Sequence, residues 1–92
     1  MIGFRDSETE SVFQGRFSKK LPDDIQQRAR RRLIQLHSSS SINDLRIPPS
    51  NRLVRFRGDR AEEWSIRVNR QWRIVFHWED GNAADVAIED YH

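Results

Sequence analysis

Two apolar alternations in the second half of the chain constrain the fold most tightly. Every second residue is apolar in residues 64–68 and again in residues 72–78, so each segment predicts a strand with one apolar face. Residues 69–71 separate the two segments, a spacing typical of a short hairpin. All three tryptophans of the chain lie on this apolar face, which must therefore be buried against the rest of the chain.

The other face of the predicted hairpin is polar and cationic. By the same alternation it carries Ser65, Arg67, Asn69, Arg73, Val75 and His77. Because opposed residues of an antiparallel pair share a face, Arg67 and Arg73 should lie close together. We expect this side of the sheet to be uncovered, and it is the first place to look for function.

Two helices are predicted ahead of the hairpin. The spacing of Ser7 and Glu10 is that of a capping box, which indicates a helix from about residue 7 that ends by Gly15. A second helix begins near Pro22, where proline and two acidic residues suit a first turn. Its apolar stripe consists of Ile25, Ala29, Leu33 and Leu36. The arginines of this helix lie mainly off the stripe, and we expect them to be solvated or to meet a partner protein, outside the active site.

Further strands are predicted on both sides of the hairpin. Residues 52–57 form one of them, a turn at residues 80–82 leads into the last, and residues 2–4 suit a short edge strand. Ala84, Val86 and Ile88 should continue the apolar face. The prediction is a single α+β domain over residues 1–92, with two N-terminal helices packed on one face of a mainly antiparallel, twisted sheet.

Composition limits the classes of function. The 92 residues are 36% hydrophobic and 33% charged, which suits one small core and leaves no apolar run long enough to cross a bilayer. No secretory pattern and no cysteine are present, which favours a cytoplasmic protein without disulfides or thiolate metal ligands. Of the 16 basic residues only Lys19 and Lys20 are lysines. Because the forked donors of arginine match phosphate oxygens, nucleic acid and acidic proteins are favoured partners, although arginines that merely solvate the surface are an equal alternative.

Candidate reactive groups come from the strand arginines and from the end of the sequence. They are Arg57, Arg67 and Arg73, with Asp90, Tyr91 and His92 at the last three positions. Such a set suits metal-free RNA cleavage, in which a base activates the 2′-hydroxyl, an acid protonates the departing 5′-oxygen and cations stabilise the phosphate charge. No glycine-rich phosphate loop or metal-ligand spacing is present, so we expect no metal or other cofactor. The alternative is that Tyr91 caps the core and His92 is idle.

Four stretches together resemble the HigB toxins of the RelE superfamily, which are the killer proteins of type II toxin–antitoxin modules. They are residues 53–60, 64–69, 72–74 and 89–92, and the similarity spans nearly the whole chain. The resemblance implies a RelE-like fold. It also implies an mRNA interferase, a ribosome-dependent endoribonuclease that cuts translated mRNA and so inhibits translation and growth.

The resemblance also assigns residues. The catalytic residues it implies are Arg57, Arg73, Asp90, Tyr91 and His92, and the RNA-binding residues are Arg55, Arg57, Arg67 and Arg73. The sequence departs from the family at Val54, where several members have a histidine. The difference matters because valine cannot transfer a proton. One proton transfer is then expected from His92 and the other from Asp90 or Tyr91, and the activity is expected to be weaker.

The partners that the resemblance implies are a helix-turn-helix antitoxin similar to HigA, the ribosome with its mRNA, and operator DNA bound through the toxin–antitoxin complex. No membrane partner is expected. Two other functions stay open: a non-catalytic toxin on the same scaffold, comparable to the ParE inhibitors of gyrase, and a module that only binds RNA or an acidic antitoxin segment. The terminal acid, tyrosine and histidine favour the nuclease, because binding alone does not require them.

Overall fold

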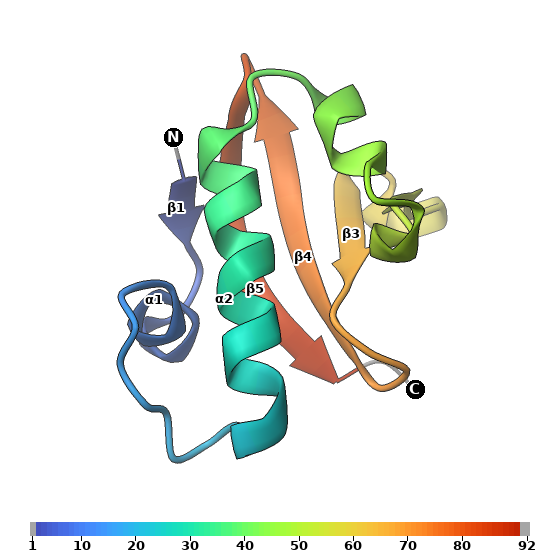
Figure 1. Ribbon diagram of the computed structural model, residues 1–92. Helices are drawn as coiled ribbons and strands as arrows, with labels where there is room; N and C mark the ends of the chain where they lie inside the picture. The colour runs from blue at the N-terminus through green and yellow to red at the C-terminus, as the bar shows by residue number, and fades with distance from the viewer. Residues whose placement is uncertain (1, 91–92) are drawn as a thin grey trace.

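The two apolar alternations form the centre of a five-stranded sheet. The protein is described here by a computed structural model that covers residues 2–90, and its strand order is β1-β5-β4-β3-β2 (Figure 1). The strands are β1 (Ile2–Phe4), β2 (Val54–Arg55), β3 (Glu63–Arg67), β4 (Trp72–Glu79) and β5 (Asn82–Asp90). All neighbouring pairs are antiparallel except β1 with β5, which is parallel. The sheet is therefore mainly antiparallel, as predicted.

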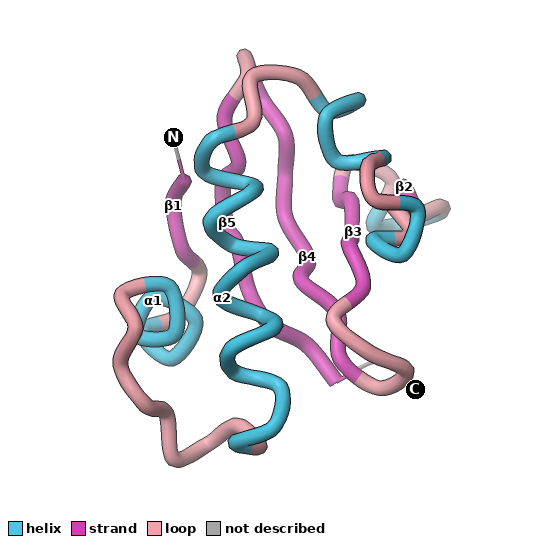
Figure 2. Tube along the Cα trace, in the orientation of Figure 1, coloured by secondary structure: helices cyan, strands magenta, loops and turns pink. Residues whose placement is uncertain are grey.

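Two helices cover one face of this sheet. They are α1 (Ser7–Phe13) and α2 (Asp23–Ser38), and α2 lies across the sheet in contact with β4 and β5 (Figures 1 and 2). Three short 3₁₀ helices lie between α2 and β3: η1 (Ile42–Arg46), η2 (Pro49–Asn51) and η3 (Gly58–Arg60). The predicted α+β architecture is confirmed.

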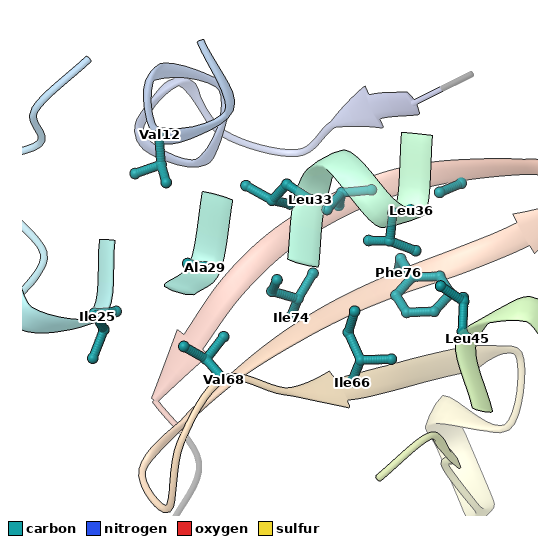
Figure 3. Packing of buried hydrophobic residues seen from close by; sticks show 12 residues of the cluster. Val12, Ile25, Ala29, Leu33, Leu36, Leu45, Ile66, Val68, Ile74 and Phe76 are labelled. Carbon is teal, nitrogen blue, oxygen red and sulfur yellow. The ribbon is translucent and has the colours of Figure 1, made fainter. Parts of the chain in front are cut away.

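The core lies between α2 and the apolar face of the hairpin. The predicted stripe of α2 is buried along its whole length, as are Ile66, Ile74 and Phe76 on the sheet (Figure 3). The three tryptophans pack against this core while remaining partly exposed. Because each buried aliphatic or aromatic side chain contributes about 1.5–3 kcal/mol to folding, this layer is the main source of stability.

The ends of two elements differ from the prediction. Asp6, and not Ser7, caps α1, because its carboxylate accepts a hydrogen bond of 2.7 Å from the backbone N–H of Thr9. Residues 52–57 form only the two-residue strand β2, since Arg52 adopts a left-handed conformation with φ of 45° that does not extend a strand. The edge of β3 beyond β2 is therefore left without a neighbouring strand.

A bulge in β5 corrects the predicted face of one residue. Ala84 stands opposite His77 on the polar face, so the expectation that Ala84 continues the apolar face is wrong. Asp85 has φ of 51° and acts as an extra residue in the strand. The apolar face is instead completed by Ala83 before the bulge and Val86 after it, and both are buried.

The polar face of the sheet is closed at its centre. Ser65, Val75 and Ala87 lie on this side, yet none is more than 3% exposed. The expectation of an uncovered face is therefore wrong for the middle of the sheet, and it holds only toward the hairpin loop, where half-buried Arg67 and Arg73 lie.

Four charged side chains cross over this closed centre. Arg5 and Arg60 each pair with both Glu63 on β3 and Glu89 on β5, at distances of 2.6–3.1 Å, so the network spans β4. Hydrogen bonds from Arg60, and then from Arg5, lower the pKa of Glu63 to about 2 and outweigh the opposing effect of burial. The network therefore stabilises the folded state when Glu63 is ionised.

Acidification should remove this contribution. A carboxyl whose pKa is lowered by folding stabilises the protein above its unfolded-state pKa and loses that effect as the pH falls toward its folded-state pKa. We expect Glu63→Gln to lower the free energy of unfolding by about 1–2 kcal/mol at neutral pH, after allowance for the half-exposed arginines. The difference should shrink as the pH falls from about 4.5 to about 2. Urea denaturation at several pH values measures it, with exposed Glu79→Gln as control; a difference that is the same at every pH would contradict this origin.

Candidate functional site

The open part of the polar face lies where β3, β4 and β5 approach the β3–β4 loop. Arg67 stands directly opposite Arg73 in the register, which confirms their predicted proximity. On β5 the residue opposite Arg73 is Glu89, whereas Asp90 stands opposite Trp72 and so belongs to the helix-covered side. The Asp90 carboxylate accepts a hydrogen bond of 3.1 Å from the side chain of Gln71. We call Arg67 and Arg73, the last register pair of β3 and β4 before the hairpin loop, the cationic end of the sheet.

The guanidinium of Arg73 is held in a defined direction. Its Nε donates to Ser65 Oγ at 3.1 Å, and its Nη2 donates to the backbone carbonyl of Arg52, also at 3.1 Å. Ser65 is fully buried, so this contact is fixed by the sheet. Val54 stands opposite Ser65 and is 43% exposed. Val54, where the family resemblance led us to expect a histidine, therefore lies on the same face as Arg73.

Arg67 is anchored in a similar way. Its Nε donates to the backbone carbonyl of Asn69 at 3.0 Å, within the hairpin loop. The N–H groups at its end remain directed away from that contact, since a guanidinium carries five N–H donors in a fixed fork. The cationic end therefore presents two arginines whose side chains are each oriented by the backbone.

The remaining predicted site residues are placed differently. Arg55 stands opposite Trp64 and lies over its ring at 5.5 Å, so it belongs to the helix-covered side and is not brought together with Arg67 and Arg73. Arg57 precedes η3, is exposed, and has no hydrogen bond or ion pair to any described residue. Tyr91 and His92 lie outside the described residues, and their assigned roles stay predictions.

Two arginines of α2 reach the sheet, which the sequence reasoning missed. Arg28 Nη1 donates to the Val68 carbonyl at 3.4 Å, and Arg32 Nε donates to the Arg67 carbonyl at 3.3 Å. Both carbonyls lie at the edge of β3 that β2 is too short to cover. The available signal was their spacing, because positions 28 and 32 border the apolar stripe of α2 and so point toward the sheet margin.

Among residues 2–90, no acidic side chain forms an ion pair with Arg32. Burial, and then the neighbouring charges of Arg28 and Arg31, lower the pKa of Arg32.

Within residues 2–90 no group of histidine, cysteine, aspartate and glutamate side chains is arranged to hold a metal ion. None of the helices in that range is both long and apolar enough to cross a membrane.

Comparison with known proteins gives one consistent family. Residues 2–92 match the family described as the RelE-like toxin of type II toxin–antitoxin system HigB. Toxin HigB-1 of Vibrio cholerae serotype O1 is 33% identical over 91 residues, which cover 98% of this chain and 96% of that toxin. An uncharacterized protein of Haemophilus influenzae is 30% identical over 89 residues, which cover 96% of this chain and 88% of that protein.

A third relative matches over a shorter segment. Endoribonuclease HigB of Proteus vulgaris is 47% identical over 36 residues, which cover 39% of each chain. The family match and the Vibrio cholerae toxin both extend over almost all of the sequence, so they decide the assignment. The chain belongs to the HigB-like family, the RelE-like toxins of type II toxin–antitoxin systems.

Proposed function

We propose that this toxin is a metal-independent endoribonuclease that cleaves ribosome-bound mRNA and thereby inhibits translation and growth. The observation that carries the proposal is the cationic end of the sheet, where Arg67 and Arg73 face each other. Arg73 stands between Arg67 on β3 and Glu89 on β5, so two guanidinium groups lie side by side where one RNA phosphate could accept hydrogen bonds from both. A relative named endoribonuclease HigB supports the same activity.

The predicted site residues together include the types that attack by the 2′-hydroxyl requires. Arg73 is oriented by Ser65 and by the Arg52 carbonyl, and its role is to stabilise the charge that develops on the phosphate. Arg57, which the family resemblance also assigns, precedes η3 and is not brought together with Arg73, so its role stays a prediction. Asp90 stands opposite Trp72, the residue before Arg73, and Tyr91 and His92 come after it in the sequence. In this proposal His92 makes one proton transfer, and Asp90 or Tyr91 makes the other.

Membership of a type II family implies an antitoxin partner. In this proposal the antitoxin is a helix-turn-helix protein similar to HigA, and the complex binds the operator DNA of its own genes. The toxin acts in the cytoplasm, on mRNA held by the ribosome.

The test is to map RNA ends in cells shortly after the toxin is induced. The parent should produce new mRNA ends within translated regions. Arg73→Ala should reduce their appearance by about 10²-fold or more and should abolish growth arrest, since the oriented donor is lost. Arg31→Ala serves as control, because Arg31 is an exposed arginine on α2 that does not belong to the cationic end.

Two results would contradict the proposal. Toxicity with unchanged transcripts and with DNA damage would instead support a gyrase inhibitor. Cleavage that is as fast in Arg73→Ala as in the parent would show that the reaction occurs elsewhere.

Restoring a histidine at position 54 should raise the activity. Val54 lies opposite Ser65, which contacts Arg73, so an imidazole there could exchange a proton close to the bound phosphate. We expect Val54→His to accelerate cleavage at least about tenfold, with a new dependence on pH near about 6.5. Single-turnover cleavage of mRNA on purified ribosomes measures this, with Val54→Gln as a polar control that cannot titrate. Equal rates for both variants would exclude proton transfer from this position.

A further inference from the structure

A hollow of about 910 Å³ lies at the open edge of β3, between α2, η2 and the β3–β4 loop. Its charged lining consists of Arg28, Arg32, Arg52, Arg67 and Arg70, and we call these five residues the basic hollow. Among the residues that the structure describes, no carboxylate and no aromatic side chain lines it. A ligand of this hollow must therefore be an anion, and it would not be held by stacking on a ring.

Three arginines of the basic hollow are oriented by hydrogen bonds to backbone carbonyls. Arg32 and Arg67 each use Nε to donate to a backbone carbonyl, that of Arg67 and that of Asn69 respectively. Arg28 uses one terminal nitrogen on the Val68 carbonyl. This arrangement fixes the side chains and keeps other N–H donors of the guanidinium groups for a ligand. Three of the five arginines of the hollow are thus positioned donors.

The fold pairs its arginines with acids elsewhere but not here. Over the centre of the sheet, Arg5 and Arg60 are paired with Glu63 and with Glu89, which stands opposite Arg73. In the hollow the neighbouring charges that act on Arg32 are those of other arginines, and burial together with them lowers its pKa. An external anion is the missing counter-charge.

A purely structural role does not account for the whole set. Arg28 and Arg32 could serve only to satisfy the carbonyls at the edge of β3. The side chains of Arg52 and Arg70, however, are exposed and have no hydrogen bond or ion pair within residues 2–90. They add charge to the hollow without supporting the fold.

The basic hollow adjoins the cationic end of the sheet. Arg67 belongs to both, and it stands opposite Arg73. The carbonyl of Arg52 accepts a hydrogen bond from Arg73, and Arg52 holds a left-handed backbone with φ of 45° that few non-glycine residues adopt. A strand of RNA with one phosphate at Arg73 would therefore have neighbouring phosphates available to the hollow.

We propose that the basic hollow binds backbone phosphates of the same RNA strand, beside the phosphate that is cleaved. This inference rests on the proposed nuclease function and adds a second contact region for its substrate. Because the lining offers guanidinium groups and no stacking ring, the hollow holds the backbone and does not read the bases. RNA is favoured over an acidic protein segment because the hollow is continuous with the proposed cleavage site.

The experiment measures binding separately from cleavage. Purified toxin is titrated with a fluorescent single-stranded 2′-O-methyl RNA, which cannot undergo 2′-hydroxyl attack, over a range of salt concentrations. Arg32→Gln and Arg70→Gln should each weaken binding at least about threefold at low salt, and should reduce the slope of log affinity against log salt by about 0.7. Arg31→Gln removes the same charge from α2 outside the hollow and should bind like the parent.

The control variants distinguish loss of RNA binding from loss of folding and from binding of an acidic protein. Arg70→Gln changes a side chain without a fold contact, so it tests the hollow even if Arg32→Gln is unstable. Affinities of Arg32→Gln and Arg70→Gln equal to that of Arg31→Gln would overturn the inference. Loss of binding to a polyglutamate peptide, with RNA binding unchanged, would assign the hollow to an acidic protein and would also overturn it. Failure of the nuclease proposal itself would show instead as an absence of new mRNA ends in cells that express the parent.

Discussion

The register of the β3–β4 pair is the constraint on which the rest of the structure depends. Ile66 opposite Ile74 places the apolar side chains of both strands under α2, and the next pair, Arg67 opposite Arg73, then falls on the other face. A slip by one residue would exchange the two faces, so it would expose the core and bury the arginines. One pairing therefore sets both the stability of the fold and the position of its cationic end.

The polar face is divided into two electrostatic regions. Across the centre, from Glu63 on β3 to Glu89 opposite Arg73 on β5, two arginines and two glutamates neutralise one another and close the face over the buried Ser65 and Val75. Toward the β3–β4 loop, arginines gather from α2, from the segment after η2 and from the hairpin, and the hollow they line holds no acid within the described part of the chain. The ion-paired network contributes stability, and the basic hollow supplies charge that an RNA phosphate can neutralise.

Local periodicity in the sequence was sufficient to predict the main elements and their faces. The buried stripe of α2, the apolar hairpin face and the opposition of Arg67 to Arg73 all result from periods of 3.6 or two residues. Three features could not be predicted from local sequence patterns, because they depend on contacts between distant segments. They are the bulge at Asp85, the short β2 and the approach of Arg28 to the Val68 carbonyl. The roles assigned to Tyr91 and His92 stay predictions.

We propose that the arginines near the hairpin loop, and not those of the ion-paired network, contact RNA. The NMR spectrum of the arginine Nε–H groups, recorded while an uncleavable RNA is added to the labelled toxin, tests this contact. If the contact forms, the Nε–H signals of Arg67 and Arg73 shift, whereas those of Arg5 and Arg60 stay in place. Shifts confined to Arg5 and Arg60, or no shift at any of the four, would contradict it.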